Sequence, residues 1–233
     1  MKRFYKLVTL GEETAEGYQL LLDNKPVRTP DKKIFFIPSR YLADLIVKEW
    51  EAQTDEIRPL TMSVCQMTMT LIDRVIPHRK ALEEEMLGYI DTDLICYRAD
   101  EPERYKRAQE EKWNPFIEWF DQTFKLRLQT TTGLSSLTQH PDIHQAIANH
   151  VATLSDNQLM AMYLATMGTG SIILALAFQM RAFPNDVILA AAFAEELLKD
   201  EIYLGHIYGS APDQEKKYLS LQNDLQTLEH FLI

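Results

Sequence analysis

Cysteine is nearly absent from this chain of 233 residues, which contains only Cys65 and Cys96. Two thiols cannot form the disulfide framework that holds small secreted domains together. Both lie in apolar stretches, so we expect free, buried thiols in a reducing compartment. The chain has no apolar segment behind its first basic residues and no Ser- and Arg-rich amphipathic leader. We therefore expect a cytoplasmic bacterial protein, or a mitochondrial matrix protein whose leader has been removed.

Basic residues are outnumbered, with 24 Lys and Arg against 34 Asp and Glu, which gives a net charge of −10. A general nucleic-acid binder needs the opposite balance, because its Lys and Arg side chains neutralise phosphates. We therefore expect no nucleic acid among the partners.

Long apolar runs are also missing. The uncharged stretch 157–180 is interrupted by polar residues, and its longest clean run, Ile172–Phe178, is far shorter than the about 20 residues of a membrane span. We expect no membrane span, but two buried core helices that meet at the turn Gly168–Ser171.

The first 38 residues are rich in aromatic and β-branched residues, in short runs separated by polar turns. This pattern predicts three or four antiparallel strands. Asn24 suits the turn before the third strand because Asn tolerates a positive φ. So few strands need another element to cover their apolar face, and we expect Trp50 to help join them to the helices.

After Pro38 the apolar residues recur with the 3.6-residue period of a helix, and Ser39 is suited to cap the first helix, which reaches Trp50. We expect Pro77 to end the next helix and Pro115 to kink or start another. The further helices are predicted at 61–76, 78–89, 102–124, 142–153, 156–167, 170–181, 185–208 and 213–232. The expected fold class is α+β, mainly α, with a small N-terminal antiparallel β unit at 1–38 packed on a larger helical domain at 39–233.

The turn Gly168–Ser171 precedes an apolar helix, and free N–H groups at a helix N-terminus can bind phosphate. A P-loop would also need more glycines, a following Lys and a preceding strand, which this sequence lacks. We favour a tight corner between two helices, capped by Thr or Ser. The alternative is a small-anion-binding enzyme that uses this turn, with Arg74 or Arg98 as a clamp.

Asp91 and Asp93 form a carboxylate pair of the kind that binds hard cations or transfers protons. No third or fourth oxygen ligand stands at loop spacing. We therefore favour a helix cap that pairs with Arg74 or Arg98.

Three histidines, His140, His144 and His150, lie within eleven residues, without the glutamate of a zinc-protease helix. We interpret them as surface or capping residues. The sequence predicts no metal site, no cofactor and no catalytic residue.

Several short blocks resemble, in order and spacing, the assembly chaperone family that binds the alpha subunit of the catalytic F(1) head of the F-type ATP synthase, found in mitochondria and alphaproteobacteria. Together they extend over essentially the whole chain. The blocks are Leu22–Pro30, Pro38-Ser39 with Glu49–Gln53, Ile57 with Pro59, Thr61-Met62, Ile72–Val75, Tyr89–Leu94 with Tyr97–Ala99, Trp113–Pro115 and Thr169–Ser171. Asn24 stands where the family more usually has Gly.

The last block departs from the family pattern, which runs Glu, two positions, Gln, three positions, Trp-Gly. Glu201 and Gly209 match it, whereas Leu204 replaces the Gln and Tyr208 conservatively replaces the Trp. If these residues touch the client, the contact chemistry of this protein is altered.

The resemblance implies a non-catalytic binding protein without a cofactor. Such a chaperone covers apolar surface on the unassembled alpha subunit until that subunit pairs with beta. A purely structural subunit of some complex is a further alternative, distinguished by stoichiometry because a chaperone is absent from the finished assembly. The implied partner-binding residues are Glu201, Tyr208, Glu195 and Glu196. The motif residues with expected structural roles are Trp50, Asp73, Arg74, Asp91, Asp93 and Arg98.

Overall fold

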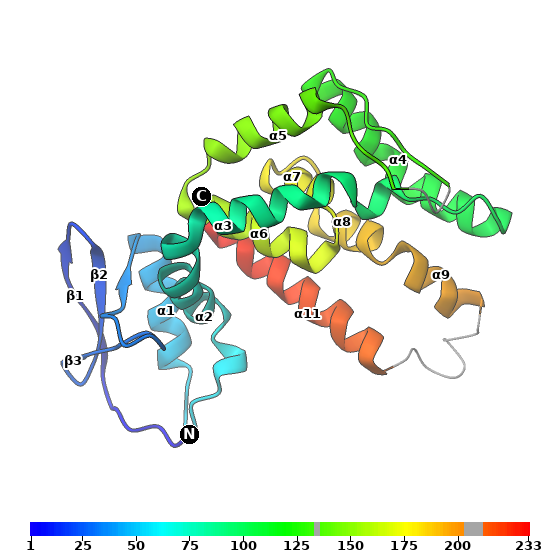
Figure 1. Ribbon diagram of the computed structural model, residues 1–233. Helices are drawn as coiled ribbons and strands as arrows, with labels where there is room; N and C mark the ends of the chain where they lie inside the picture. Colours follow the sequence, from blue (N-terminus) through cyan, green and yellow to red (C-terminus); the bar gives the residue numbers. More distant parts are fainter. Residues whose placement is uncertain (133–135, 203–211) are drawn as a thin grey trace. The chain divides into compact units, whose positions relative to one another are not determined.

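The computed structural model of the chain describes residues 1–132, 136–202 and 212–233. It contains two compact units, Met1–Arg79 with Ile233, and Lys80–Leu232, which are described separately below (Figure 1). A small antiparallel sheet lies at the N-terminal end, and helices dominate the rest, so the predicted fold class is confirmed. The division into independent domains at residue 38 stays a prediction.

The sheet of the first unit is built around its second strand. Its strands are β1 (Val8–Thr14), β2 (Gly17–Leu22), β3 (Lys25–Pro26) and β4 (Phe36–Ile37). β2 pairs antiparallel with each of the other three. Gly17 begins β2 with φ +118°, and a Cβ at this position would lie 2.2 Å from the carbonyl oxygen of Ile37, so only glycine fits.

The turn between β2 and β3 has two residues in the left-handed region, Asp23 with φ 49° and Asn24 with φ 63°. A two-residue hairpin loop with two positive φ angles is a type I′ turn, whose twist matches that of the strands. The predicted role of Asn24 is therefore confirmed. The Asp23 carboxylate also accepts hydrogen bonds from the Lys6 and Leu7 amides, which fixes the N-terminal segment beside the turn.

The sheet is covered by α1 (Arg40–Glu51), which contacts β1, β2 and β4. Ser39 caps α1 as predicted, since its side chain accepts a hydrogen bond from the Leu42 amide. The 3₁₀ turn η1 (Pro59–Thr61) leads to α2 (Ser63–Thr70). Glu49 of α1 accepts hydrogen bonds from the Val64 and Cys65 amides, both at 2.8 Å, and so holds the first turn of α2.

Trp50 is buried where the N-terminal segment, α1 and α2 meet. Its carbonyl oxygen accepts a 2.6 Å hydrogen bond from the Tyr5 hydroxyl, and the two rings pack edge to face. Its indole N–H donates to the Cys65 sulfur at 3.3 Å. Trp50 therefore joins the strand-bearing segment to two helices, as predicted.

Both cysteines are free and buried, as predicted. Burial raises the pKa of Cys65 to about 12 and also raises the pKa of Cys96. Thiols that stay protonated at neutral pH are poor nucleophiles, so neither is a reactive centre.

The helical backbone breaks at His78, one residue after Pro77, so the predicted helix end is confirmed to within one residue. The π-helical turn η2 (Leu71–Val75) follows α2 directly, and α3 (Ile76–Leu87) continues across Pro77 with a kink at His78, where φ is −120°. The extra residue of a π turn changes the helical register. Pro77 has no backbone N–H to donate to the preceding turn, and a kink beside it is the usual result.

The second unit is helical. It begins at Lys80 within α3 and continues with η3 (Gly88–Asp91), η4 (Leu94–Cys96), α4 (Glu103–Phe124) and α5 (Pro141–Ala152). Its further elements are α6 (Asp156–Thr169), α7 (Ile172–Gln179), α8 (Asn185–Ala192), α9 (Ala194–Ile202), α11 (Pro212–Leu228) and η5 (Glu229–Phe231). The helix α4 runs through Pro115 and does not start there.

The core of this unit is formed around α6 and α7, which meet at Gly170 as predicted (Figure 1). Every residue from Ile172 to Phe178 is buried. No helix in the described ranges is long and apolar enough to cross a membrane. The apolar character of α7 therefore reflects burial inside the protein.

The single helix predicted over 185–208 is interrupted. Phe193 separates α8 from α9 with φ −108° and ψ 21°, and its ring packs against Tyr218 of α11 at 5.2 Å. The Ala-rich sequence around Phe193 has no Gly or Pro that would have indicated the break. Residues 203–208 of the predicted helix lie outside the described residues.

We predict that Trp50→Ala destabilises the protein by about 3–5 kcal/mol, because a buried indole is replaced by a cavity. Urea unfolding followed by circular dichroism measures the change, and little soluble protein is expected at 37 °C. Tyr41→Ala, an exposed aromatic of the same helix, is the matched control. A Trp50→Ala protein as stable as this control would show that the indole does not join these elements.

Candidate functional site

The carboxylate of Asp93 lies fully buried against the N-terminus of α7. It accepts hydrogen bonds from the Ser171 hydroxyl at 2.7 Å, the Ile173 amide at 3.0 Å and the Ile95 amide at 3.1 Å. The first amides of a helix have no partner within the helix and carry a partial positive charge. Asp93 therefore supplies the anion that this buried helix end requires.

The turn Gly168–Ser171 is consequently a structural corner. Gly170 ends α6 with φ 70°, and Ser171 caps α7 by accepting a hydrogen bond from the Leu174 amide at 3.0 Å. The anion at this turn is the protein's own Asp93 carboxylate, and Ser171 is fully buried. The favoured interpretation as a helix corner is confirmed, and the alternative of a small-anion-binding enzyme is wrong.

Burial raises the pKa of Asp93 to about 6, because desolvation of the charged form outweighs the hydrogen bonds from Ile173, Ser171 and Ile95. The predicted cap is thus confirmed, but its expected arginine partner is not. Arg98 instead donates from Nε to the Ile95 carbonyl at 3.1 Å and from Nη1 to Asn114. Burial also lowers the pKa of Arg98.

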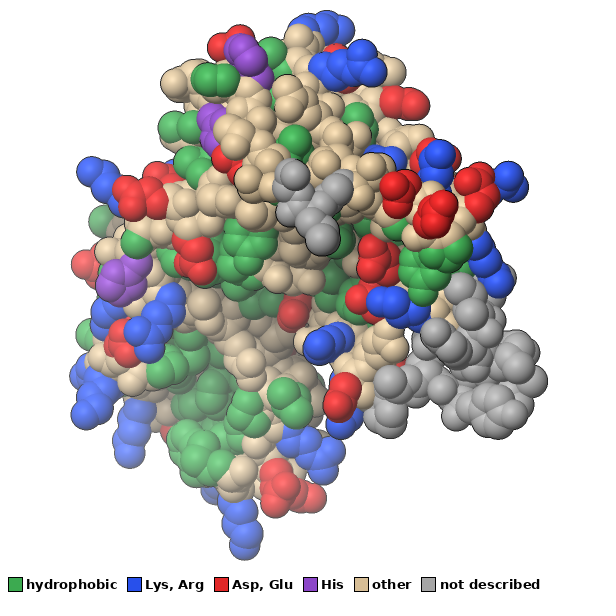
Figure 2. All heavy atoms as spheres, turned by 45° about the vertical axis from the view of Figure 1, so that its right-hand side comes forward, with side chains coloured by type: hydrophobic (Ala, Val, Ile, Leu, Met, Phe, Trp, Pro, Cys, Tyr) green, Lys and Arg blue, Asp and Glu red, His purple; other side chains and the backbone are tan. Residues whose placement is uncertain are grey.

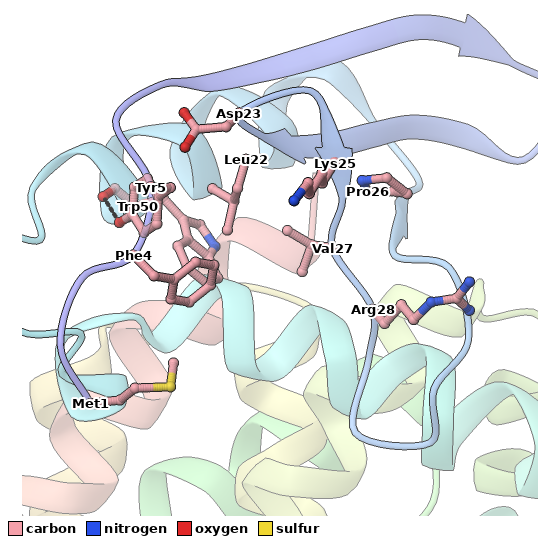
Figure 3. Close-up of a pocket in the computed structure, with 10 residues that line it drawn as sticks. All are labelled: Met1, Phe4, Tyr5, Leu22, Asp23, Lys25, Pro26, Val27, Arg28 and Trp50. Atoms are coloured by element: carbon pink, nitrogen blue, oxygen red, sulfur yellow. Dashed lines mark hydrogen bonds between the residues drawn. The ribbon is translucent and has the colours of Figure 1, made fainter.

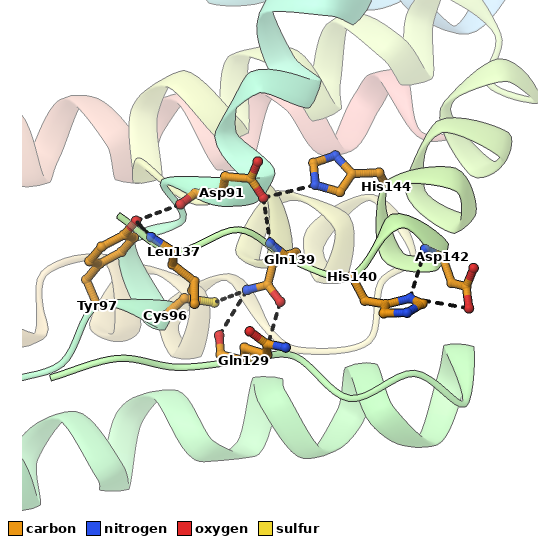
Figure 4. A network of polar contacts seen from close by, with 9 residues as sticks. All are labelled: Asp91, Cys96, Tyr97, Gln129, Leu137, Gln139, His140, Asp142 and His144. Carbon is orange, nitrogen blue, oxygen red and sulfur yellow. Dashed lines mark hydrogen bonds and ion pairs between the residues drawn. The ribbon is translucent and has the colours of Figure 1, made fainter. Parts of the chain in front are cut away.

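Asp91 joins three separate segments (Figure 4). Its Oδ1 lies 2.9 Å from Nε2 of His144 and accepts the Gln139 amide at 2.8 Å. Its carbonyl oxygen accepts a hydrogen bond from the Tyr97 hydroxyl at 2.8 Å. The Leu137 amide in turn donates a hydrogen bond to the Tyr97 hydroxyl at 2.9 Å. The side-chain partner of Asp91 is therefore a histidine, and the network fastens the extended segment before α5 to η3.

Gln139 is a buried structural residue that the sequence did not reveal. Its side-chain amide donates to the Gln129 carbonyl and accepts from the Gln129 amide, both at 2.9 Å. It also donates to the Cys96 sulfur at 3.6 Å (Figure 4). A glutamine in a polar stretch carries no pattern of its own, so only the folded arrangement identifies this role.

The histidines are capping or surface residues, as predicted. His140 caps α5 by accepting the Asp142 amide at 3.3 Å, and His150 lies 2.7 Å from the Gln179 side chain. Within the described part of the chain, no three His, Cys, Asp or Glu side chains are grouped closely enough to hold a metal ion.

Asp73 fastens the turn before β4 to the π-helical turn of the first unit. Its buried carboxylate accepts the Thr29 hydroxyl at 2.8 Å and the Asp31 amide at 2.9 Å, and lies 3.4 Å from the Lys33 ammonium. Although burial opposes ionisation, these partners hold the pKa of Asp73 below its usual value. The neighbouring Arg74 is exposed. Asp73 therefore has a structural role, as expected.

The acidic stretch on α9 contains the residues with implied partner contacts. Glu195 accepts a 2.8 Å hydrogen bond from Gln109 of α4 and lies 3.9 Å from Lys199. Glu196 is half-buried. The side chain of Glu201 and the whole of Tyr208 lie outside the described residues. Glu195 thus contributes to helix packing whatever its part in binding.

Comparison with known proteins identifies the fold over the whole chain. The sequence model described as "ATP12 chaperone protein" matches residues 2–121. The crystal structure of Atp12 from Paracoccus denitrificans is 29% identical, with a TM-score of 0.87, and the match covers 99% of this chain and 97% of that one. The Atu1473 protein of Agrobacterium tumefaciens is 31% identical, with a TM-score of 0.88, over 99% of this chain and 85% of that one.

The chain belongs to the ATP12 chaperone family. The function predicted from the resemblance, an assembly chaperone of the F1-ATPase and not an enzyme, is confirmed. A mutant of the Paracoccus protein with aspartate replaced by lysine has a similar structure, with 29% identity, a TM-score of 0.86 and coverage of 99% and 96%.

The acidity of this ATP12 chaperone is confined to one unit. Residues 1–79 carry 12 Lys and Arg and 11 Asp and Glu, which gives a charge of +1, and the remainder carries 12 and 23, which gives −11. Figure 2 shows charged side chains at the edges of the visible face, with apolar side chains exposed between them. The two units therefore present different electrostatic surfaces to a partner.

We predict that Asp93 makes this ATP12 chaperone more stable as the pH falls from about 6 to about 4. Its native carboxyl takes up a proton near pH 6, whereas the unfolded one does so near 3.8, so the native state holds the extra proton in that window. Asp93→Asn removes this contribution. The stability difference between parent and variant should change by about 2 kcal/mol between pH 7 and pH 4.5.

Urea unfolding at pH 4.5, 5, 6 and 7 measures this difference, and Asp121→Asn on the exposed face of α4 is the matched control. A parent protein that loses stability relative to Asp93→Asn as the pH falls would contradict the account. That result would mean that the hydrogen bonds, and not burial, dominate the pKa of Asp93.

Proposed function

We propose that this chain binds the unassembled alpha subunit of the F-type ATP synthase and releases it to the beta subunit. The observation that carries the proposal is the likeness to Atp12 over 99% of the chain. The polar motif residues are consistent with it, because Asp91, Asp93 and Arg98 are all engaged in hydrogen bonds within the fold. Binding of the alpha subunit then depends on the exposed side chains. We expect the protein in the bacterial cytoplasm or the mitochondrial matrix.

The proposed contact in the second unit is the exposed side of α9. Leu197 is 43% exposed, although a leucine is ordinarily buried, and it follows Phe193 by one turn. Phe193 meets Tyr218 of α11, and the next residue, Leu219, is 48% exposed. The acidic residues of α9 accompany this apolar surface. An apolar patch with a charged rim is typical of a protein-binding surface.

We further propose three residues as contacts with the alpha subunit: Glu196 of α9, and Glu201 and Tyr208, which are chosen from the family resemblance alone. Glu195 is a weaker candidate, because one of its oxygens already accepts the Gln109 amide. A carboxylate at the rim of an interface steers the encounter and disfavours wrong partners. An aromatic side chain supplies contact area at a low entropic cost.

Capture of purified alpha subunit by the immobilised chaperone tests the function. We expect alpha to be retained when it is added alone, and to be released when beta is added. Failure to retain alpha, or retention of a stable complex that also contains beta, would contradict the proposal. The second outcome would instead indicate a structural subunit.

We predict that Glu201→Lys weakens capture of the alpha subunit while it leaves the melting temperature nearly unchanged. Single charges at a helix surface contribute little to stability, whereas reversal of an interfacial charge slows association. The matched control is Glu215→Lys on the exposed part of α11. The binding rate should be measured at low salt, where charge effects are largest. Equal capture by the two variants would exclude Glu201 as a contact.

A further inference from the structure

A pocket of about 430 Å³ opens on the first unit beside the N-terminal segment (Figure 3). Three separate parts of the chain line it: the first five residues, the turn that joins β2 to β3, and the end of α1. Most of the lining is apolar. The apolar lining residues are Met1, Phe4, Tyr5, Leu22, Pro26, Val27 and Trp50.

The floor of this pocket is fixed, while its outer wall is open to water. Tyr5, Leu22 and Trp50 are buried, and the Tyr5 hydroxyl is bonded to the Trp50 carbonyl. Phe4 is 64% exposed and packs edge to face on Tyr5. Asp23 accepts the Lys6 and Leu7 amides, and the Arg3 amide donates to the Asp55 carbonyl at 2.9 Å, so the segment that carries Phe4 is anchored on both sides. The pocket is therefore preformed.

Two cations and one carboxylate line the pocket, so its net charge is positive. Lys25 and Arg28 line it and are exposed, and Arg28 donates only to the Lys32 carbonyl, at 2.8 Å. Among the residues that the structure describes, neither side chain has a carboxylate partner within ion-pair distance. The lining carboxylate, Asp23, accepts the Leu7 and Lys6 amides, and these hydrogen bonds together with the nearby Lys6 and Lys25 charges lower its pKa. An apolar pocket with two cations at its edge is complementary to an apolar side chain next to a carboxylate.

We propose that this pocket is a second client contact, which takes an extended acidic and apolar segment of the unassembled alpha subunit. An aromatic or aliphatic client side chain packs between Phe4 and Val27, and a neighbouring client carboxylate meets Lys25 and Arg28. This inference rests on the proposed function. It gives the near-neutral first unit a binding role distinct from that of the acidic α9 in the second unit.

The test compares binding of purified alpha subunit to the full-length chaperone and to two variants. Phe4→Ala removes the exposed wall, and the double variant Lys25→Glu with Arg28→Glu reverses the edge charge. Lys48→Glu, at an exposed position of α1 outside the pocket, is the matched control. Phe4→Ala and the double variant should each raise the Kd about ten-fold, as expected for the loss of an interface anchor, whereas the control should leave the Kd unchanged. The effect of the double variant should shrink at high salt.

Unchanged melting temperatures confirm that the variants are folded. Parent protein that binds alpha, together with pocket variants that bind as well as Lys48→Glu, would overturn this inference and leave the proposed function intact. Parent protein that fails to bind alpha would overturn the function and the inference together.

Overlapping 15-residue peptides of the alpha subunit provide a second measurement. Peptides that bind the parent but not Phe4→Ala should carry a large apolar residue within three positions of Asp or Glu. Selection of basic peptides would overturn the charge argument. Sedimentation of the chaperone alone checks for a second copy as occupant, and a dimer that Phe4→Ala dissociates would overturn the inference.

Discussion

The second unit depends on one buried carboxylate. All seven residues from Ile172 to Phe178 are buried, so the first amides of α7 cannot reach water. An unsatisfied buried N–H costs about 1–3 kcal/mol, and Asp93 satisfies the helix end from a loop 80 residues before Ile173. The same bond fixes the position of η4 against the central helices. The adjacent Asp91 then ties η3 to the segment before α5 through Gln139 and His144.

The first unit uses carboxylates in the same way. Glu49 accepts the first amides of α2, Asp73 accepts the Asp31 amide, and Asp23 accepts those of Lys6 and Leu7. Groups that could serve catalysis in another protein are therefore occupied in holding the backbone. The paired aspartates and the Gly-rich turn of this acidic chain thus have structural roles. Client binding is therefore the role of exposed residues, and the exposed surfaces of the two units differ in charge.

Local structure was predictable where the signal lies within a few residues. Asn24 and Ser39 act as their types suggest, and the interrupted apolar stretch forms two core helices. The sequence did not predict the π turn before Pro77 or the break at Phe193, because tertiary packing determines both. The partner of Asp91 was also missed, since its nearest candidates along the chain were arginines and its actual partner, His144, is 53 residues away.

The candidate site was predictable only through the family resemblance. Glu201 and Tyr208 matched or replaced residues of a known block, but no pattern in the chain itself marks them as contacts. The pocket of the first unit was not predicted, because Phe4, Val27 and Trp50 come together only in the fold. An exposed aromatic near an N-terminus is ordinary in a sequence, and its position beside Lys25 and Arg28 is visible only in the structure.

Hydrogen exchange of the chaperone, measured with and without alpha subunit, tests most directly the claim that two surfaces, and not the buried turn, hold the client. The account predicts slower exchange in residues 1–7 and 194–202, with the amides of α7 unchanged because they are already buried. Protection confined to other segments, or changed exchange around Gly168–Ser171, would contradict it.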